Sequence, residues 1–279
     1  MKADLHIHST VSDGSDTIEQ IICKAKGKGL DAIAITDHDT LSHLRQIPAI
    51  CRGDNLPPAT FAIAYDIKII GGVEISSIHR KTNTRVHVLG YNIENTGVIT
   101  ALTQPLLEAR NKNSEKQADV LIRFGYMIDM DKLARADGKY LYKQHIMDWL
   151  VKTGQSPDMF GDLYKKTFKN GGPCAFDIEY IDVFDAVKAV KEAGGLAVLA
   201  HPGQQQNFWL IPELIGCGLD GLELNHHTHT EKDKDIIWDY AKEYDLFLTG
   251  GSDYHGRYEP QPFGIGDILS DESGVSVIC

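Results

Sequence analysis

The sequence contains no apolar stretch that approaches the roughly 20 residues needed to cross a bilayer. Its N-terminal residues lack the apolar region of a secretory signal peptide. Its five cysteines are odd in number and widely separated, and no two of them form a CxxC pair. We therefore expect a cytoplasmic protein that does not act at a membrane and whose cysteines are free, buried thiols.

An excess of basic residues is also missing. The chain has 28 Lys and Arg residues against 39 Asp and Glu residues, which gives a formal net charge of -11. Affinity for long nucleic acid comes mostly from Lys and Arg side chains that neutralise phosphates. Long nucleic acid is therefore not an expected partner. Small anionic substrates stay compatible with this charge, because bound cations can reverse the local field.

The composition is that of an ordinary globular protein, with 42% apolar and 24% charged residues in 279. Short apolar runs alternate with amphipathic helical segments at both ends of the chain, which predicts a parallel α/β sheet covered by helices. The expected strands are Ala3–His8, Asp31–Thr36, Ile67–Glu74, Arg85–Gly90, Leu196–Ala200, Gly221–Leu224 and Leu246–Thr249. The expected helices include one capped by Thr17 and Gln20, then Leu41–Cys51, Val183–Ala193 and Glu231–Tyr244.

Residues 95–174 interrupt this alternation. The segment is mostly helical by pattern, rich in Lys and Asp, and strongest as a helix over Leu102–Phe124. We expect an inserted helical subdomain at 95–174, with residues 1–94 and 175–279 forming the main α/β domain.

Histidines and carboxylates recur at or just after the predicted strand ends. The motifs are Asp4-Leu5-His6-Ile7-His8, Thr36-Asp37-His38-Asp39, Gly72-Val73-Glu74 with Val86-His87-Val88, Ala200-His201-Pro202-Gly203, and Gly251-Ser252-Asp253-Tyr254-His255. Parallel α/β barrels form their active sites at the carboxyl ends of the strands, so one mouth would collect these side chains. Imidazoles combined with carboxylates suit Zn, Mn or Fe. The pattern therefore predicts a metal centre.

These motifs resemble those of the PHP family, named for polymerase and histidinol phosphatase. The resemblance rests on DLHIHSTVSDGS, AIAITDHDT, GGVEIS with VHVLGY, LAVLAHPG and GGSDYH, and covers nearly the whole chain. It is closest to the stand-alone bacterial branch of metal-dependent phosphoesterases. The resemblance implies a distorted (β/α)7 barrel that binds two or three divalent ions, of Mn, Zn or Fe, with Mg also possible.

The resemblance also implies how the ligands are shared. The first ion would be held by His6, His8, Glu74 and Asp253, the second by Glu74, His87 and His201, and the third by Asp13, His38 and His255. Among these, Glu74, Asp253, His201 and His255 are the expected catalytic residues. Asp4 is expected to orient His6 or His8.

In this branch the insertion lies over the metal mouth, and a basic residue followed two positions later by His contacts the substrate. Here that motif is Lys143-Gln144-His145, where many relatives have Arg-Pro-His. We expect Lys143, His145 and Arg110 to bind substrate, although a solvated helix face also explains both basic residues. The run Asn225–His229 is expected at the surface or rim, because family ligands do not fall there.

The expected reaction is hydrolysis of a phosphate monoester. Two neighbouring ions lower the pKa of a shared water from about 15.7 towards about 7, so that hydroxide can attack the phosphorus. The predicted substrate is a small phosphorylated metabolite or nucleotide, such as the 3′-phosphate of a nucleoside 3′,5′-bisphosphate. Alternatives are a histidinol phosphate phosphatase or an exonuclease on short oligonucleotides. A non-catalytic metal-binding regulatory module is a further alternative, but it predicts lost ligands, and none is missing.

Overall fold

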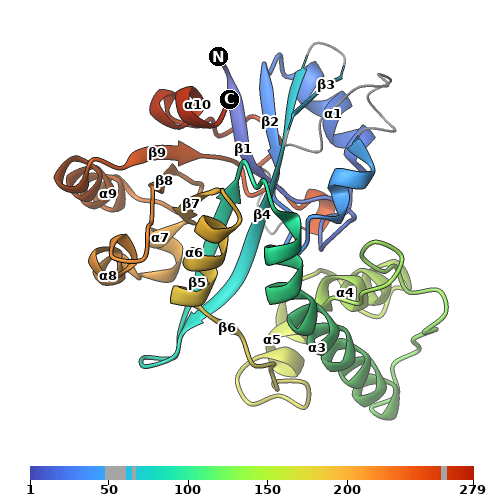
Figure 1. Cartoon of the computed structure of the whole chain (residues 1–279). Helices are drawn as coiled ribbons and strands as arrows, with labels where there is room; N and C mark the ends of the chain where they lie inside the picture. The colour runs from blue at the N-terminus through green and yellow to red at the C-terminus, as the bar shows by residue number, and fades with distance from the viewer. Residues whose placement is uncertain (48–60, 65–66, 259–262) are drawn as a thin grey trace.

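Seven strands follow one another around a nearly closed, barrel-like sheet in the computed structural model, which describes residues 1–47, 61–64, 67–258 and 263–279 (Figure 1). Their order is β1 (Ala3–Ile7), β2 (Ala32–Ile35), β4 (Ile67–His79), β5 (Thr84–Tyr91), β7 (Leu196–Leu199), β8 (Gly221–Asn225) and β9 (Phe247–Gly250). Two short strands, β3 (Phe61–Ala64) and β6 (Ile181–Asp182), pair with β4 outside this path. A parallel bridge between Ile7 and Tyr254 brings the two ends of the sheet together. The α/β barrel expected from the resemblance is confirmed.

The prediction that the sheet is parallel was wrong at β5. This strand runs antiparallel to both of its neighbours, β4 and β7. Only residues 80–83 separate β4 from β5, and a parallel connection needs a dozen residues or more. The chain therefore turns back on itself, and Asn83 has a φ of 58° in the turn. As a result, Glu74 and His87 lie on two arms of one hairpin.

Helices cover the outside of the barrel (Figure 1). They are α1 (Ile18–Gly27), α6 (Val183–Glu192), α7 (Pro202–Gln205), α8 (Ile211–Ile215), α9 (Glu231–Tyr244) and α10 (Glu272–Ile278). The predicted capping box at α1 is confirmed, with Thr17 and Gln20 bonding each other's backbone amides. The helix predicted at Leu41–Cys51 begins only as a 3-10 turn over Ser42–Arg45, and residues 48–51 of that prediction lie outside the described residues.

The barrel strands are buried on both faces, and this is what removes the site residues from water. All five residues of β1 are buried, including the polar Asp4 and His6. Apolar residues of neighbouring strands, such as Leu5 and Ile33, fill the space around them and are completely buried. Polar side chains in such surroundings need partners, because burying them alone is costly.

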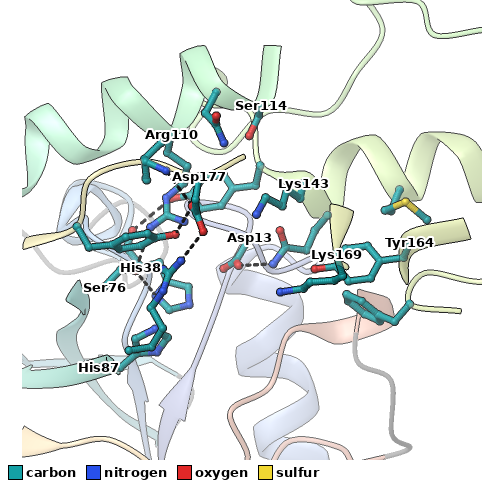
Figure 2. A pocket seen from close by; sticks show the side chains of 18 residues that line it. Asp13, His38, Ser76, His87, Arg110, Ser114, Lys143, Tyr164, Lys169 and Asp177 are labelled. Atoms are coloured by element: carbon teal, nitrogen blue, oxygen red, sulfur yellow. Dashed lines mark hydrogen bonds and ion pairs between the residues drawn. The ribbon is translucent and has the colours of Figure 1, made fainter. Parts of the chain in front are cut away.

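The inserted segment forms three helices, α3 (Thr96–Arg123), α4 (Lys143–Lys152) and α5 (Asp162–Phe168), which project from one side of the barrel (Figure 1). Helix α3 begins earlier than predicted, because the Asn95 side chain accepts a bond from the Gly97 amide and caps it. The helices share an apolar cluster that includes Leu121, Leu150 and Phe168. The insertion and the barrel mouth enclose the cavity drawn in Figure 2.

Two other sequence predictions concern the cysteines and the membrane. The four described cysteines are free, as predicted, but Cys23 is exposed and only Cys174 is buried; Cys51 lies outside the described residues. Among the described residues, no helix combines the length and apolar character that a bilayer crossing requires.

Candidate metal centre

The barrel mouth collects every residue that the sequence analysis assigned to a metal. His6 and His8 come from β1 and its end, His38 follows β2, and His201 follows β7, as expected for the carboxyl ends of barrel strands. Asp253 and His255 follow β9, and Asp13 lies in the loop after β1. Glu74 and His87 come instead from within the β4–β5 hairpin. The donor atoms of all these residues except His201 fall into three overlapping groups, described in turn below.

The first cluster consists of His6, His8, Glu74 and Asp253, the four residues expected around the first ion. His6 Nε2 lies 3.2 Å from Glu74 Oε2 and 3.3 Å from Asp253 Oδ1. His8 Nε2 lies 3.1 and 3.2 Å from the same two oxygens. Two imidazoles and two carboxylates therefore surround one point, a ligand set suited to Zn, Mn or Fe.

Glu74 divides its two oxygens between the first cluster and its neighbours. Oε1 lies 2.8 Å from His87 Nδ1 and 2.9 Å from His201 Nε2, whereas Oε2 faces the first cluster. His38, Glu74 and His87 form the second cluster, so His38 joins the residues expected around the second ion, and His201 adjoins them through Oε1. A carboxylate placed between two groups of imidazoles would be able to hold a cation at each oxygen.

Glu74 is 1% exposed. Burial opposes its charge, but interactions with the surrounding histidines outweigh that effect and hold its pKa well below the usual range. The bridging position is therefore occupied by an ionised carboxylate.

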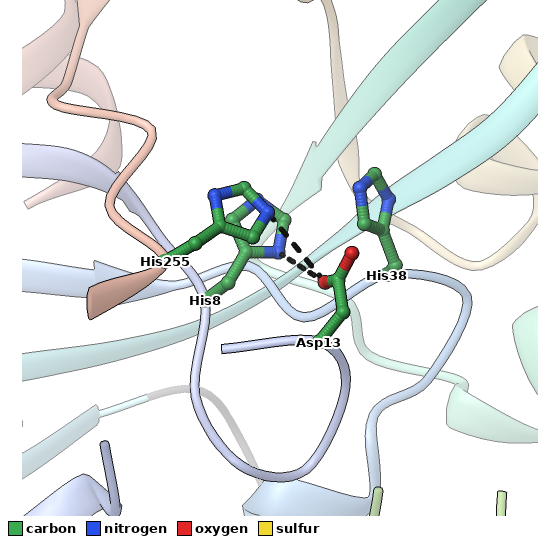
Figure 3. A group of neighbouring side chains, drawn as sticks. All are labelled: His8, Asp13, His38 and His255. Atoms are coloured by element: carbon green, nitrogen blue, oxygen red, sulfur yellow. Dashed lines mark ion pairs between the residues drawn. The ribbon is translucent and has the colours of Figure 1, made fainter. Parts of the chain in front are cut away.

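The third cluster consists of His8, Asp13, His38 and His255 (Figure 3). Asp13 Oδ1 lies 3.8 Å from His8 Nδ1 and 3.5 Å from His255 Nε2. The rings of His8 and His255 stack with centroids 4.1 Å apart. Three of these residues were expected together, and the structure adds His8. Burial is the main cause that lowers the pKa of His38 to about 4, which keeps this imidazole neutral and able to act as a ligand.

Unpartnered buried atoms show that these residues fit divalent cations. His6 Nε2, both ring nitrogens of His8, Asp13 Oδ1, His201 Nδ1 and Asp253 Oδ1 are buried and have no hydrogen-bond partner. Each such atom costs about 1–3 kcal/mol when it is left unsatisfied. These atoms belong to side chains that converge at the barrel mouth, although other unpartnered buried atoms, such as those of His43 and Gln117, lie elsewhere. Cations shared between these atoms would satisfy them together.

Glu223 is a site residue that the sequence analysis missed. It is completely buried on β8; its Oε1 lies 3.0 Å from His6 Nδ1, and its Oε2 accepts a 2.7 Å bond from the His201 backbone amide. Burial opposes its charge, but His6 prevails and lowers the Glu223 pKa to about 2. A carboxylate behind a ligating histidine fixes the ring orientation and raises its basicity. The only signal was an acidic residue inside the apolar run Gly221–Leu224.

Replacing Glu223 with alanine should weaken metal binding about 10- to 100-fold, the usual cost of losing such a supporting partner. Glu223→Gln should lose less, because its amide oxygen can still accept the bond from the His201 amide. Calorimetric titration with Mn²⁺ measures both variants. Equal affinity in wild type and Glu223→Ala would remove Glu223 from the site.

His226 is another missed residue. It was expected at the surface or rim, yet it is 4% exposed, and its Nε2 lies 3.3 Å from Asp253 Oδ2. His229 is also buried, and it accepts a bond from the Gly203 amide at Nε2. The rim prediction was therefore wrong for both. The sequence signal was their position directly after the tip of β8.

Asp4 supports the site differently from the prediction. Its carboxylate accepts bonds from the Ser252 amide at 2.9 Å, the Ser252 hydroxyl at 2.6 Å and the Gly266 amide at 2.8 Å. It thus holds the loop that carries Asp253, and does not contact an imidazole of the first cluster by any described bond. Burial raises the Asp4 pKa to about 6.

A cavity of about 290 Å³ opens beside the second and third clusters (Figure 2). Asp13, His38 and His87 form its metal side. The remaining wall includes four cations, one carboxylate and four aromatic residues, namely Arg85, Arg110, Lys143 and Lys169, Asp177, and Tyr142, Tyr164, Tyr180 and Phe160. Such a cavity suits an anionic molecule held against the metal centre.

Of the three residues predicted to bind substrate, two line the cavity and one does not. Lys143 and Arg110 line the cavity, and burial lowers the Lys143 pKa. Arg110 Nη2 is already bonded to Asp39 at 2.7 Å and to Ser76 at 3.0 Å. His145 is 3% exposed, accepts the Tyr142 amide at Nδ1, and is not part of the described cavity wall.

Comparison with known proteins places this geometry in a family. The sequence profile of the PHP domain matches residues 4–190. Phosphoribosyl 1,2-cyclic phosphate 1,2-diphosphodiesterase from Eggerthella lenta is 41% identical over 266 residues, which cover 94% of this chain and 97% of that protein. A 5'-3' exoribonuclease from Haemophilus influenzae is 29% identical, covering 91% of this chain and 90% of its own.

Two further proteins that are similar to this chain also have the names of phosphoesterases. A 3',5'-nucleoside bisphosphate phosphatase from Chromobacterium violaceum is 29% identical, covering 92% of this chain and 88% of its own. A crystal structure from Bifidobacterium adolescentis, described as a metal-dependent phosphoesterase, superposes with a TM-score of 0.84 at 25% identity, covering 99% of this chain and 94% of that one. The profile match and the identity to the Eggerthella protein show that this chain belongs to the PHP domain family.

Proposed function

We propose that this protein hydrolyses a phosphate ester of a small phosphorylated metabolite or nucleotide at the barrel mouth. The broader class, a metal-dependent phosphoric ester hydrolase, follows from the family and its relatives. The observation that carries the proposal is the complete ligand set, gathered in overlapping clusters beside a cationic cavity. A non-catalytic regulatory module predicts missing ligands and is disfavoured for that reason.

The cavity favours a substrate with a second anionic group. Lys143 and Lys169 lie on its wall, and Arg85 there is paired with Asp177, whereas the phosphate to be hydrolysed would lie against His38 and His87. The insertion supplies two of these cations, and residues 95–174 as a whole contain twelve Lys and Arg against nine Asp and Glu. The cavity is thus more basic than the chain as a whole, and it would attract a doubly phosphorylated molecule.

Two such molecules are candidates, and both contain a phosphorylated ribose. A nucleoside 3′,5′-bisphosphate is favoured by the aromatic wall of Tyr164 and Tyr180, on which a base can stack. A phosphoribosyl cyclic phosphate is favoured by the 41% identity to the Eggerthella lenta enzyme of that name. Cleavage of a cyclic diester therefore joins monoester hydrolysis as a candidate reaction. The net charge of -11 disfavours an exonuclease on long chains.

Each part of the site has a role in this reaction. Bound divalent ions would supply an activated water at neutral pH and would neutralise charge on the phosphate. Glu74 would hold two ions at a fixed separation, because each of its oxygens faces a different cluster. Glu223 and His226 hold His6 and Asp253 in place. Lys143 would bind and orient the remote anion, and the insertion would exclude bulk water.

A substrate panel tests the proposal. Hydrolysis should be fastest for ribose compounds with two phosphate groups, with Mn, Zn, Fe and Mg supplied separately. Inorganic phosphate measures cleavage of a monoester, and the ring-opened product, separated by chromatography, measures cleavage of a cyclic diester. Histidinol phosphate and short oligonucleotides serve as the competing substrates. Faster hydrolysis of either of these, or no hydrolysis of any compound with any ion, would contradict it.

Lys143→Ala should raise KM about tenfold or more for a doubly phosphorylated substrate while kcat changes little. A hydrogen bond to a charged group contributes about 1.5–3 kcal/mol, and an interaction made equally in the ground and transition states affects KM alone. Lys166→Ala is the matched control, since Lys166 is exposed on α5 and outside the cavity wall. Equal KM values for both variants would remove Lys143 from the binding site.

A further inference from the structure

The insertion contacts the third cluster directly through Gln144, at the start of α4. Gln144 Nε2 donates a 2.7 Å hydrogen bond to Asp13 Oδ2. The other carboxylate oxygen, Asp13 Oδ1, faces His8 and His255 and has no hydrogen-bond partner. The bond therefore fixes the carboxylate so that one oxygen stays available to a cation.

A second contact comes from Arg110 on α3. Its Nη2 donates to Asp39 Oδ2 and to Ser76 Oγ, and Ser76 Oγ lies 3.4 Å from His38 Nδ1. Asp39 Oδ1 in turn accepts the Ser76 amide at 2.7 Å. Asp39 has a φ of 61°, a conformation that is unfavourable for a residue other than glycine and needs support from its surroundings. Arg110 thus braces the turn that carries His38.

The first cluster is supported differently. Its described supporting side chains, Glu223 behind His6 and His226 behind Asp253, both come from the barrel. Asp4 holds the Asp253 loop and is also a barrel residue. The first cluster can therefore form without the insertion. The third cluster, in contrast, has Asp13 and His38 each held by a different helix of the insertion.

We propose that the third cluster is a cation site that depends on the insertion being seated against the barrel mouth. Gln144 and Arg110 are its positioning residues, and a divalent ion bound there would hold the insertion closed over the substrate cavity. Coupling between two equilibria is reciprocal. If contact of the insertion with the barrel mouth strengthens ion binding by a given factor, ion binding favours that contact by the same factor. The inference rests on the metal centre of the proposed function and adds a link between one ion and the closed state.

Replacement of Gln144 by methionine tests the link, since methionine keeps the length of the side chain and removes the donor. Equilibrium dialysis against Mn²⁺ should show one class of site weakened about 10- to 100-fold, the range for lost supporting partners, with the other sites unchanged. Gln104→Met is the matched control, because the side-chain bonds of Gln104 to described residues go to Glu108 and Tyr140, both within the insertion. It should bind all ions as the wild type does.

A reference variant identifies which ion is affected. His255 belongs to the third cluster alone, so His255→Ala should remove the same class of site. Adding Gln144→Met to His255→Ala should then cause no further loss, because both changes act on one site. Arg110→Met should weaken the sites to which His38 contributes, in the second and third clusters. Arg135→Met, which breaks contacts to Glu115 and Asn111 within the insertion, should weaken neither.

Hydrogen exchange supplies a readout that needs no substrate. Mn²⁺ should slow exchange of the α4 amides in the wild type and in Gln104→Met, but not in Gln144→Met. Wild-type ion binding in Gln144→Met, equal weakening of every site, or no effect of Mn²⁺ on α4 would each overturn the inference. If the wild type binds no cation, the proposed function fails as well. If the wild type binds cations and hydrolyses its substrate but one of these three outcomes is found, only the link between the ion and the insertion fails.

Discussion

Replacement of His8 by alanine should abolish hydrolysis, with kcat falling roughly 10³-fold or more. His8 Nε2 faces Glu74 and Asp253 in the first cluster, and its ring stacks on His255 of the third. A single substitution therefore removes a donor atom from the first cluster and a packing partner from the third. Each ion contributes several kcal/mol of charge stabilisation to the transition state, and about 1.4 kcal/mol corresponds to tenfold in rate. Phosphate release and metal content, measured on the same sample, check this result.

The fold should survive this change. Most single substitutions cost about 0.5–3 kcal/mol, less than the stability of a typical domain. His79→Ala is the matched control: His79 is also a buried histidine, lies on β4 and contacts Thr82 and Trp209 outside the three clusters. It should lose some stability and keep both metal and activity. Activity near the wild-type level in His8→Ala would refute the assigned centre.

Removal of metal by a chelator should abolish activity and also lower the melting temperature by roughly 5–10 °C. A ligand that binds only the folded protein stabilises it by about 2.7 kcal/mol at a hundredfold excess over Kd. For domains of similar size, about 1 kcal/mol shifts Tm by 2–4 °C. The physical source is the set of unpartnered donor atoms in the clusters, which are left without cations. Calorimetry with and without added Mn²⁺ measures the shift.

This stabilisation should shrink as the pH falls. Burial lowers the pKa of His6, but Glu223, Asp253 and Glu74 outweigh it and raise that pKa well above its usual value. In the metal-free protein His6 therefore holds a proton up to higher pH, and a metal ion has to displace that proton. The shift in Tm at fixed Mn²⁺ should increase as the pH rises. A melting temperature that is the same with and without metal would contradict both expectations.

Much of the site could be predicted from local sequence. The motifs name residues with metal-binding chemistry, and alternating strand geometry places His6 and His8 on one side of β1. Because each motif follows an apolar run, the position of the barrel mouth could be predicted too. The Thr17 capping box was equally local and is confirmed. The family resemblance added a prediction of which residues hold each ion, which residue spacing alone does not give.

Other features could not be predicted, because they join residues that are far apart in the chain. Glu223 bonds a histidine 217 positions away, and Gln144 bonds a carboxylate 131 positions away. The direction of β5 was mispredicted because strand periodicity is the same for parallel and antiparallel pairing. His226 was predicted to lie at the surface or rim, but in the closed barrel its Nε2 lies 3.3 Å from Asp253 Oδ2.

The sequence by itself therefore determined which side chains have metal-binding chemistry and near which strand ends they lie, since both depend on residue type and short-range periodicity. Only the tertiary structure decided how they are shared and supported. The reason is physical: a bridging carboxylate such as Glu74 and a brace such as Gln144 are defined by distances across a closed sheet. Those distances are set by how the strands pair and how the insertion packs.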